Sequence, residues 1–336
     1  MQVLVTGGTG YIGSHACIEL LSAGYQLVVL DNLSNSSVES LRRVETIAKK
    51  KIPFIKGDVR DLSLLRRIFT EYQIDSVVHF SGLKSVGESV AQPLSYYDNN
   101  VGGSVALFKV MAEFCCKRLV FSSSATVYGD PHVVPIREDF PLSTTNPYGA
   151  SKLMVEGVLR DLYASNTGWS IGILRYFNPV GAHESGFIGE NPNGTPNNLM
   201  PFISQVAVGQ RDVLSVFGDD YDTPDGTGVR DYIHVVDLAK GHVSALNKLM
   251  TGLQCLTVNL GTGKGCSVLD LLNAFEKVSG KKIPYQIVAR RSGDVAKCFA
   301  DPTHALDTLG WQANYDIERM CADTWRWQSN NPQGYV

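Results

Sequence analysis

A glycine-rich turn near the first residue constrains this chain more than any other feature. Residues 2–6 form a short apolar run, Gly7-Gly8-Thr9-Gly10-Tyr11-Ile12-Gly13 follows it, and residues 14–23 are amphipathic. This order predicts a strand, a tight turn and a helix. Glycines let the backbone approach a pyrophosphate closely, and a helix N-terminus offers free N–H groups and the positive end of its dipole. We therefore expect a dinucleotide at this turn.

An acidic residue ends the next predicted strand, which covers residues 26–30. Asp31 follows Gly13 by eighteen residues. A carboxylate there accepts hydrogen bonds from an adenosine ribose and repels a 2′-phosphate, which favours NAD over NADP. The alternative is a solvated aspartate that caps a loop. The third predicted strand, 53–56, leads into Asp58, which is placed to meet the adenine.

Further predicted strands alternate with helices, which indicates a doubly wound parallel sheet of the α/β class with ligands at the carboxyl ends of its strands. The strands are 76–80, 118–121 and 169–177, and the helical segments are 36–50, 62–72 and 94–115. Beyond Asn178 the chain is richer in Pro, Gly and Asn, with short strands at 213–217 and 257–260 and helical segments at 199–209, 235–249 and 267–278. We expect a Rossmann domain over 1–177 and a smaller α/β substrate domain over mainly 178–336, with an interleaved boundary.

Tyr148 and Lys152 lie four residues apart just past a predicted helix start. Residues at this spacing share a helix face, with Cβ atoms about 5–6 Å apart. An ammonium about 4 Å from a phenol, at an effective dielectric of about 20, favours the phenolate by roughly 4 kcal/mol before desolvation is subtracted. Tyr148 is therefore a candidate base near neutral pH. Ser124, at the end of strand 118–121, is its candidate hydroxyl partner, although tyrosine and lysine fall four apart in many ordinary helices and serine-rich strand ends are common turn material.

Composition excludes several classes of partner. The chain has 336 residues, 44% of them hydrophobic, a net charge of −3 and no basic run, so neither nucleic acid nor an anionic membrane surface is implied. We see no apolar run of about 18 residues and no leader segment, and we expect a cytoplasmic protein. The seven cysteines are scattered without a Cys-x-x-Cys pair, so we expect reduced, mostly core residues and no metal site.

With these motifs in order, the chain resembles the extended short-chain dehydrogenase/reductases and, among them, the UDP-glucose 4-epimerases. The resemblance runs from Met1 to Tyr335, and its most specific passages are residues 80–89, 96–100, 175–182 and 228–235. It implies tightly bound NAD, Tyr148 taking the proton of the sugar 4-hydroxyl with help from Ser124, and hydride transfer from C4 to the nicotinamide. Lys152 is implied to hold the nicotinamide ribose and to lower the Tyr148 pKa, aided by the cationic ring of the oxidised cofactor. The 4-keto sugar then turns over and the hydride returns to its opposite face.

The resemblance also implies the binding residues. For the cofactor they are Gly7, Gly10, Tyr11, Ile12, Gly13, Asp31, Asn32, Asp58, Val59, Phe80, Gly82, Lys84, Asn99, Ser122, Tyr148, Lys152 and Tyr176. For the UDP-sugar they are Lys84, Ser124, Thr126, Tyr148, Asn178, Asn198, Leu199, Ser215, Phe217, Arg230, Tyr232, Arg291, Asp294 and Cys298. Arg230 and Arg291 suit the diphosphate, because a guanidinium meets phosphate oxygens bidentately. Arginines of this kind also form ordinary surface ion pairs. A homodimer through the helices at 94–115 and 150–166 is implied as well.

Cys298 departs from the pattern of relatives restricted to glucose and galactose, in which a bulky tyrosine tends to occupy this position. A small side chain leaves room beside the sugar C2. The resemblance therefore implies that UDP-N-acetylglucosamine and UDP-N-acetylgalactosamine are substrates along with UDP-glucose and UDP-galactose.

Other interpretations stay open. A sugar-nucleotide 4,6-dehydratase typically has an Asp-Glu pair directly after the catalytic hydroxyl, where this chain has Ala125-Thr126, and this disfavours dehydration. Another nucleotide-sugar enzyme of the same family is conceivable. So is a non-catalytic NAD-binding regulator, although such proteins usually lose the tyrosine or the lysine. His79 and His234 lie in apolar strands without a second ligand nearby, and we expect core histidines.

Overall fold

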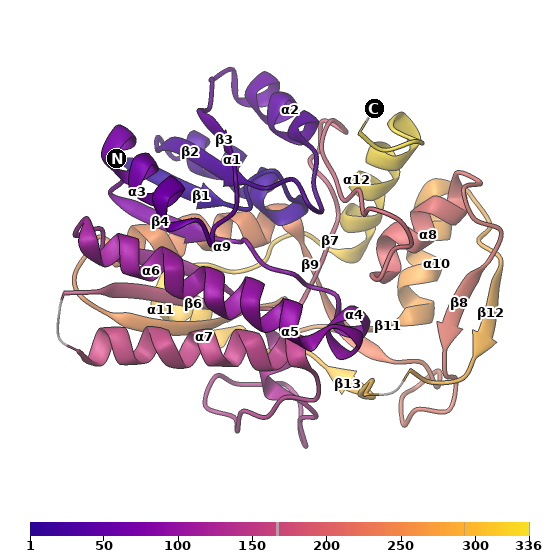
Figure 1. The fold of residues 1–336 in the computed structure, drawn as a ribbon. Coiled ribbons are helices and arrows are strands. Elements are labelled where there is room, and N and C mark those ends of the chain that lie inside the picture. The colour runs from indigo at the N-terminus through magenta and orange to yellow at the C-terminus, as the bar shows by residue number, and fades with distance from the viewer. Residues whose placement is uncertain (166–167, 292, 336) are drawn as a thin grey trace.

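A parallel sheet of seven strands forms the centre of the protein, in the order β10-β6-β5-β4-β1-β2-β3 (Figure 1). The structure is a computed structural model and describes residues 1–165, 168–291 and 293–335. The strands are β1 Gln2–Thr6, β2 Gln26–Asp31, β3 Phe54–Lys56, β4 Ser76–His79, β5 Arg118–Ser124, β6 Ser170–Tyr176 and β10 Cys255–Leu260. The predicted doubly wound α/β sheet is confirmed.

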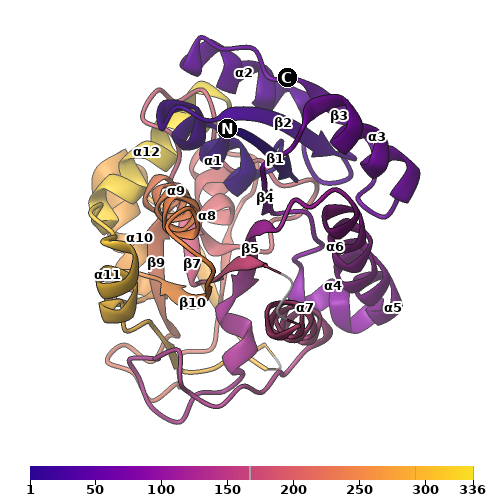
Figure 2. The same ribbon diagram turned by 90° about the vertical axis from the view of Figure 1, so that its left-hand side faces the viewer.

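Helices cover both faces of this sheet (Figure 2). One face carries α1 Tyr11–Ser22, α2 Val38–Ala48 and α9 Val235–Leu249, and the other carries α3 Leu62–Tyr72, α6 Gly103–Glu113 and α7 Pro147–Ala164. Within β1, Val3 and Val5 are buried against the helices α1, α2 and α9, whereas Leu4 is buried against α3, α6 and α7 on the opposite face. A strand buried on both faces reads as a continuous apolar run, which explains the sequence of residues 2–6. The predicted helix 150–166 corresponds to α7, and residue 166 lies outside the described residues.

Two elements that were predicted for the smaller domain, one strand and one helix, pack with the seven-stranded sheet and its helices instead. Strand β10 pairs with β6, and α9 packs against α1. The second half of the chain thus supplies an edge strand of the large sheet and one of the helices that cover it. The Rossmann part and the smaller part of the protein therefore interleave along the chain.

Residues 93–113 are helical throughout, so the predicted helical segment at 94–115 is confirmed apart from its last two residues, and a π-helical turn lies inside it. The chain forms α4 Val86–Ala91, α5 Pro93–Tyr96, a π-helical turn at Tyr97–Gly102 and then α6. The buried Asn100 gives the reason for this π-helical turn, because its amide group is fixed by partners outside the helix. Its Oδ1 accepts from the Leu83 N–H at 2.8 Å, and its Nδ2 donates to the Ser151 hydroxyl at 3.0 Å. The wide turn places Asn100 between the loop after β4 and α7.

A second, smaller set of elements lies beside the carboxyl end of the sheet (Figure 1). Strands β7 Asn178–Val180, β9 Val229–His234, β11 Gly265–Ser267 and β13 Lys297–Cys298 form one sheet, and β8 Leu214–Phe217 pairs with β12 Tyr285–Val288. Helices α8 Leu199–Ala207, α10 Val268–Ser279 and α12 Ile317–Asn330 contribute to its core, while α11 Thr303–Leu309 lies near β10.

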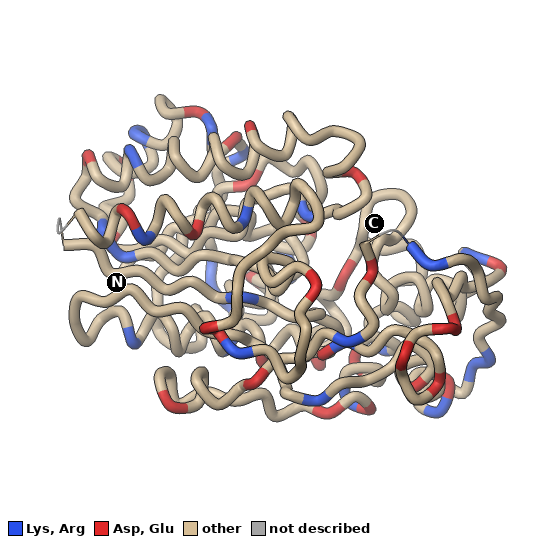
Figure 3. Tube along the Cα trace, turned by 90° about the horizontal axis from the view of Figure 1, so that it is seen from below, with Lys and Arg blue, Asp and Glu red and all other residues tan. Residues whose placement is uncertain are grey.

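Charged residues of both signs are interspersed along the chain (Figure 3). In the described part of the chain, no helix is both long enough and apolar enough to cross a membrane. All seven cysteines are free thiols, but only Cys17, Cys116 and Cys321 are buried. The expectation of mostly core cysteines therefore holds for these three alone.

Candidate active site

The glycine turn has the geometry of a phosphate-binding loop. Gly7 has φ +72°, a conformation that L side chains rarely adopt, and a Cβ on Gly13 would lie 2.2 Å from the Gly7 carbonyl oxygen. Helix α1 begins after Gly10 without a side-chain cap and without an acidic residue in its first turn. Its first N–H groups therefore lack a side-chain acceptor at the carboxyl end of β1, as an anion site requires.

Asp31 is buried beside this turn. Its Oδ2 accepts from the Thr9 N–H at 3.1 Å, and its Oδ1 accepts from the Ser36 hydroxyl at 3.0 Å. Asp31 is therefore not solvated, although it does cap the loop that follows it, since its Oδ1 also accepts from the Leu33 N–H at 2.9 Å. Along the same edge, Asn32 donates to Asp58 Oδ2 at 3.2 Å, and hydrogen bonds from Arg60 lower the pKa of Asp58 to about 2.

Ser124 and Tyr148 meet at the carboxyl end of β5. The Ser124 hydroxyl lies beside the Tyr148 phenol and accepts from Thr126 Oγ1 at 2.9 Å. Asn146 begins α7 as its N-cap, accepting from the Gly149 N–H at 2.9 Å, with Pro147 in the first helical turn. Because the helix starts at this point, Tyr148 in its first turn faces the strand end.

Lys152 lies on the same helix face and is almost fully buried. Its Nζ donates to the Ser122 carbonyl oxygen at 2.7 Å and lies 5.0 Å from the Phe121 ring centroid. Burial lowers the pKa of Lys152 to about 8, opposed by the Glu156 carboxylate. Burial also raises the pKa of Tyr148, and the neighbouring Ser124 hydroxyl opposes this rise. The lowering of the Tyr148 pKa expected from Lys152 is not found in the chain by itself, where desolvation dominates and the ammonium is bonded to a carbonyl.

The remaining cofactor candidates surround this pair or the turn. Tyr176 is hydrogen-bonded to His242, and burial raises its pKa well above the usual range, opposed by the neighbouring Ser122. A Cβ on Gly82 would lie 3.6 Å from Lys152 Nζ. Of the others, Phe80 packs on His242, Asn99 donates to Asn100, Val59 is buried, and Tyr11 and Ile12 lie in the first turn of α1.

The candidates for the UDP-sugar gather on the smaller sheets. The Arg291 guanidinium lies 3.7 Å from the centroid of the Phe217 ring, on the strand that also carries Ser215. Arg230 is 3.8 Å from Asp294 and pairs in register with Cys298. Each of the two arginines thus lies beside at least one other residue predicted to bind the UDP-sugar. Asn178 pairs with Tyr232 across β7 and β9, and Leu199 is the first residue of α8.

Glu190 connects the two candidate sets, and sequence reasoning missed it. Its Oε1 accepts from Lys84 Nζ at 3.2 Å and from Asn198 Nδ2 at 2.8 Å. Lys84 follows β4, whereas Asn198 precedes α8. A single glutamate in a coil segment carries no sequence signal for such a contact.

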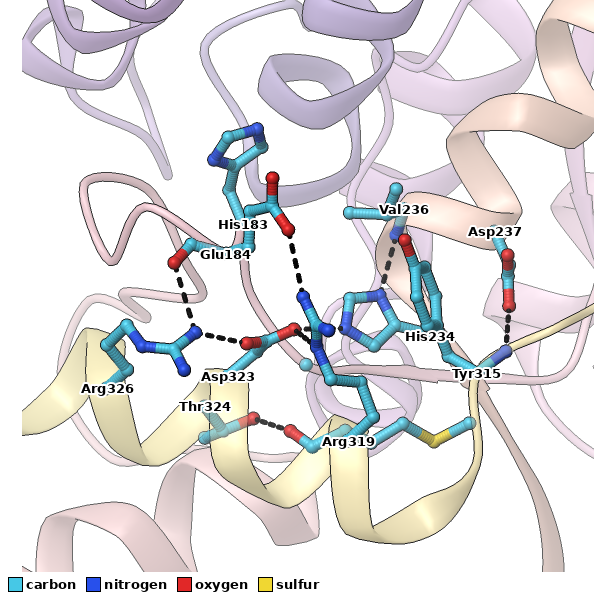
Figure 4. A network of polar contacts seen from close by, with 12 residues as sticks. His183, Glu184, His234, Val236, Asp237, Tyr315, Arg319, Asp323, Thr324 and Arg326 are labelled. Atoms are coloured by element: carbon cyan, nitrogen blue, oxygen red, sulfur yellow. Dashed lines mark hydrogen bonds and ion pairs between the residues drawn. The ribbon is translucent and has the colours of Figure 1, made fainter.

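His79 and His234 are core residues, as predicted. His79 is hydrogen-bonded to Thr6 at 2.7 Å and to Ser104 at 2.9 Å. His234 accepts from the Val236 N–H, and its Nε2 lies 3.2 Å from Asp323, which Arg319 and Arg326 also hold (Figure 4). This network fastens α12 to the end of β9. No group of three metal-binding side chains occurs among the residues described.

Comparison with known proteins extends these observations. The family model described as GDP-mannose 4,6 dehydratase matches residues 4–324. The UDP-glucose 4-epimerase of Bacillus subtilis (strain 168) is 59% identical over 335 residues, which cover 100% of this chain and 99% of that protein. The crystal structure of UDP-glucose 4-epimerase from Bifidobacterium longum in complex with NAD+ and UDP has a TM-score of 0.97 at 53% identity, covering 99% of this chain and 100% of that one.

A more distant solved relative is the UDP-Glc/GlcNAc 4-epimerase of Campylobacter jejuni. Its TM-score is 0.85 at 36% identity, and the match covers 98% of this chain and 99% of that one. The resemblance seen in the sequence motifs thus extends over the whole fold. The chain belongs to the family of the UDP-glucose 4-epimerases.

Proposed function

We propose that this protein is an NAD-dependent UDP-hexose 4-epimerase that interconverts UDP-glucose and UDP-galactose. The observation that carries the proposal is the Ser124–Tyr148 pair, which meets where β5 ends and α7 begins, with Lys152 buried on the same helix face. The pair lies at the carboxyl edge of the sheet that also holds the glycine turn, where doubly wound folds bind their ligands.

The chain has groups that suit NAD. The free N–H groups of the first α1 turn would bind the pyrophosphate, and the absent Cβ of Gly13 lets this helix approach. Asp31 would accept hydrogen bonds from the adenosine ribose, and Lys152 would hold the nicotinamide ribose. Bound NAD would supply the acceptor for the hydride of the sugar C4 and the donor for its return.

Tyr148 would exchange the proton of the sugar 4-hydroxyl, with Ser124 orienting that oxygen. Burial favours the neutral phenol, so Tyr148 becomes an effective base only when positive charge is added beside it. The oxidised nicotinamide carries such a charge. Arg230 and Arg291, with Asn198 and Phe217, would bind the nucleotide tightly, which leaves the sugar free to turn over about its phosphate linkage.

Dehydration is the reaction named in the family model, and the acid and base that it needs directly after the catalytic hydroxyl are absent from positions 125 and 126. Ala125 follows Ser124 and has no acid or base, and Thr126 donates its hydroxyl to Ser124. The regulator alternative is also disfavoured, because Tyr148 and Lys152 are both present and Tyr148 lies beside Ser124.

The proposal extends to N-acetylated UDP-sugars through Cys298. This residue is partly buried and pairs with Arg230, so it lies beside the expected diphosphate site. The cysteine side chain is small. Because burial raises the pKa of its thiol to about 11, it is also neutral near pH 7. The Campylobacter jejuni relative is described as an epimerase of both plain and N-acetylated glucose.

The decisive assay converts UDP-galactose to UDP-glucose with purified protein and no added cofactor. Tyr148→Phe should lower turnover by about 10²–10⁴-fold, since it removes the proton acceptor. Tyr163→Phe, on the exposed side of the same helix, is the matched control and should leave turnover unchanged. Bound NAD without turnover of any UDP-hexose would favour the regulator, and a product that has lost water would indicate a dehydratase.

We further propose a homodimer in the cytoplasm. Val90, Leu94 and Met154 are 63%, 81% and 50% exposed on α4, α5 and α7, which lie together and offer an apolar helical face. Free thiols suit a reducing compartment. Leu94→Arg should shift the mass measured by light scattering from dimer to monomer, whereas Leu253→Arg, at an exposed leucine elsewhere, should not. A wild-type monomer would refute the dimer, and cell fractionation tests the location.

A further inference from the structure

A buried ion pair lies directly behind the candidate catalytic residues. Glu156 follows Lys152 by four residues on α7, as Lys152 follows Tyr148, so all three share one helix face. Glu156 is 0% exposed and Arg175, on β6, is 1% exposed. The carboxylate accepts from Arg175 Nε at 3.0 Å and from Nη2 at 2.7 Å. The proposed reaction assigns no role to either residue.

The same carboxylate holds the strand that carries Ser124. Ser123 donates its hydroxyl to Glu156 at 2.6 Å, and it pairs in register with Arg175. Successive side chains of a strand point to opposite faces. Ser123 is therefore fixed from behind by Glu156, while Ser124 faces the Tyr148 phenol.

Arg175 extends this network toward the expected sugar site. Its Nη1 donates to the Tyr128 phenol at 2.8 Å, and that phenol donates to Asn259 Oδ1 at 2.7 Å. Asn259 Nδ2 donates to the Ile136 carbonyl oxygen at 2.9 Å, and the Ile136 N–H donates to the carbonyl oxygen of Phe299 at 2.8 Å. Phe299 is the neighbour of Cys298. A continuous series of hydrogen bonds thus joins the catalytic helix to the strand of the sugar site.

We propose that Glu156, paired with Arg175, is a positioning residue for the reaction: it holds β5 and Ser124 against α7, and it places a carboxylate one helical turn behind Lys152. The inference rests on the proposed function. The first part follows from geometry, because displacing a reacting group by about 1 Å can lower a rate by about 10²-fold.

The second part follows from the charges around Lys152. The groups that face it are Tyr148 and Glu156 on α7, His79 on β4, and the Ser122 carbonyl and Phe121 ring on β5. Burial lowers the pKa of His79 to about 3, so this residue is neutral. Glu156 is the member of this set that carries negative charge, and it opposes the burial that lowers the Lys152 pKa.

Glu156→Gln tests both parts, because it keeps the shape and removes the charge. We expect kcat to fall by about 10-fold to 100-fold and the basic limb of its pH profile to move toward neutral by about one pH unit. Arg160→Gln is the matched control: it removes the partly exposed third partner of the same carboxylate and should change neither quantity. A folded Glu156→Gln protein with wild-type kcat and pH profile would overturn the inference.

An unpaired buried Arg175 can also unfold the variant, since breaking a buried pair costs about 3–5 kcal/mol. The double variant Glu156→Gln/Arg175→Met removes both charges and should regain the lost melting temperature without regaining kcat. Recovery of both would show a role in stability alone. The pH dependence of NAD affinity is a readout independent of turnover. If Glu156→Gln shifts the basic limb of this NAD-binding profile while the protein turns over no UDP-hexose, the epimerase proposal is refuted. The role of Glu156 toward Lys152 is then retained.

Discussion

The carboxylate of Asp231 offers the sharpest test of how the smaller sheets are held in place. Asp231 lies on β9 and is 0% exposed. Its Oδ1 accepts from the Thr262 N–H at 2.8 Å and from the Thr262 hydroxyl at 2.6 Å, and its Oδ2 accepts from the N–H groups of Gly263 at 3.0 Å and Ala300 at 3.1 Å. One side chain thus joins β9, the turn after β10 and the segment that follows Cys298. We predict that Asp231→Asn destabilises the protein.

The size of the effect follows from the donors. Asparagine replaces one accepting oxygen with an NH2 group. If this group faces Gly263 and Ala300, two N–H donors lose their acceptor; if it faces Thr262, the hydroxyl can rotate to accept and one donor is left. A hydrogen bond to a charged group contributes about 1.5–3 kcal/mol. Burial raises the pKa of Asp231, so its charge is itself unfavourable and offsets part of this contribution.

We therefore expect a loss of about 3 kcal/mol in the free energy of unfolding. With 336 residues and an unfolding entropy of about 2.1 cal/mol/K per residue, the melting temperature should fall by about 4 °C. Circular dichroism of the NAD-loaded proteins measures this fall. Asp212→Asn, at an exposed aspartate, is the control and should stay within about 0.5 kcal/mol of wild type. An Asp231→Asn protein that melts within about 1 °C of wild type would refute the reasoning.

Three further predictions concern the cofactor, the sugar and pH. Asp31→Ser should lower NAD affinity by about 10-fold to 100-fold and reduce the discrimination against NADP; unchanged titrations with both cofactors would contradict it. Cys298→Tyr should abolish turnover of UDP-N-acetylglucosamine while the UDP-galactose reaction continues, and side-by-side assays in which both survive would dismiss the size argument. Burial lowers the pKa of His15 and His79 to about 3 and that of His242 to about 4. Their stabilising effect is present above the unfolded pKa of about 6.5 and is lost as the pH falls through the folded values, so the urea midpoint should decline from about pH 6.5 to about pH 4; a flat profile would contradict this.

Local sequence patterns made the first strand, turn, helix and strand of the fold predictable. The run from Gln2 to Asp31 places a buried strand, a glycine turn, a helix and a second buried strand in direct succession, and each is recognisable within a few residues. The two-residue strand β13 carries no such pattern, because it exists only through its pairing with β9, nearly seventy residues earlier. The three-residue strands β7 and β11 depend on β9 in the same way. Sequence reasoning missed all three.

The candidate site shows the same division. Four-residue spacing correctly placed Tyr148 and Lys152 on one helix face, because that relation is local. The direction in which the pKa of Tyr148 shifts was not predictable, since it depends on burial by elements far apart in the chain. Glu156 had the same local signal four residues further on. Its importance became visible only with Arg175, which a different strand supplies.

These contacts separate the groups that would react from the groups that would set their geometry. A transient oxidation requires Ser124, Tyr148 and Lys152 to stay aligned while the sugar turns over, so rigidity is needed on the protein side and freedom on the sugar side. Buried polar side chains with well-defined bonds supply such rigidity, because a displaced partner would be left unsatisfied away from water. Asp231 and the Glu156–Arg175 pair meet this condition, and each joins segments far apart in the chain. Substitutions at either should therefore change the relative turnover of plain and N-acetylated sugars, since the two networks end at Ala300 and Phe299, directly after Cys298.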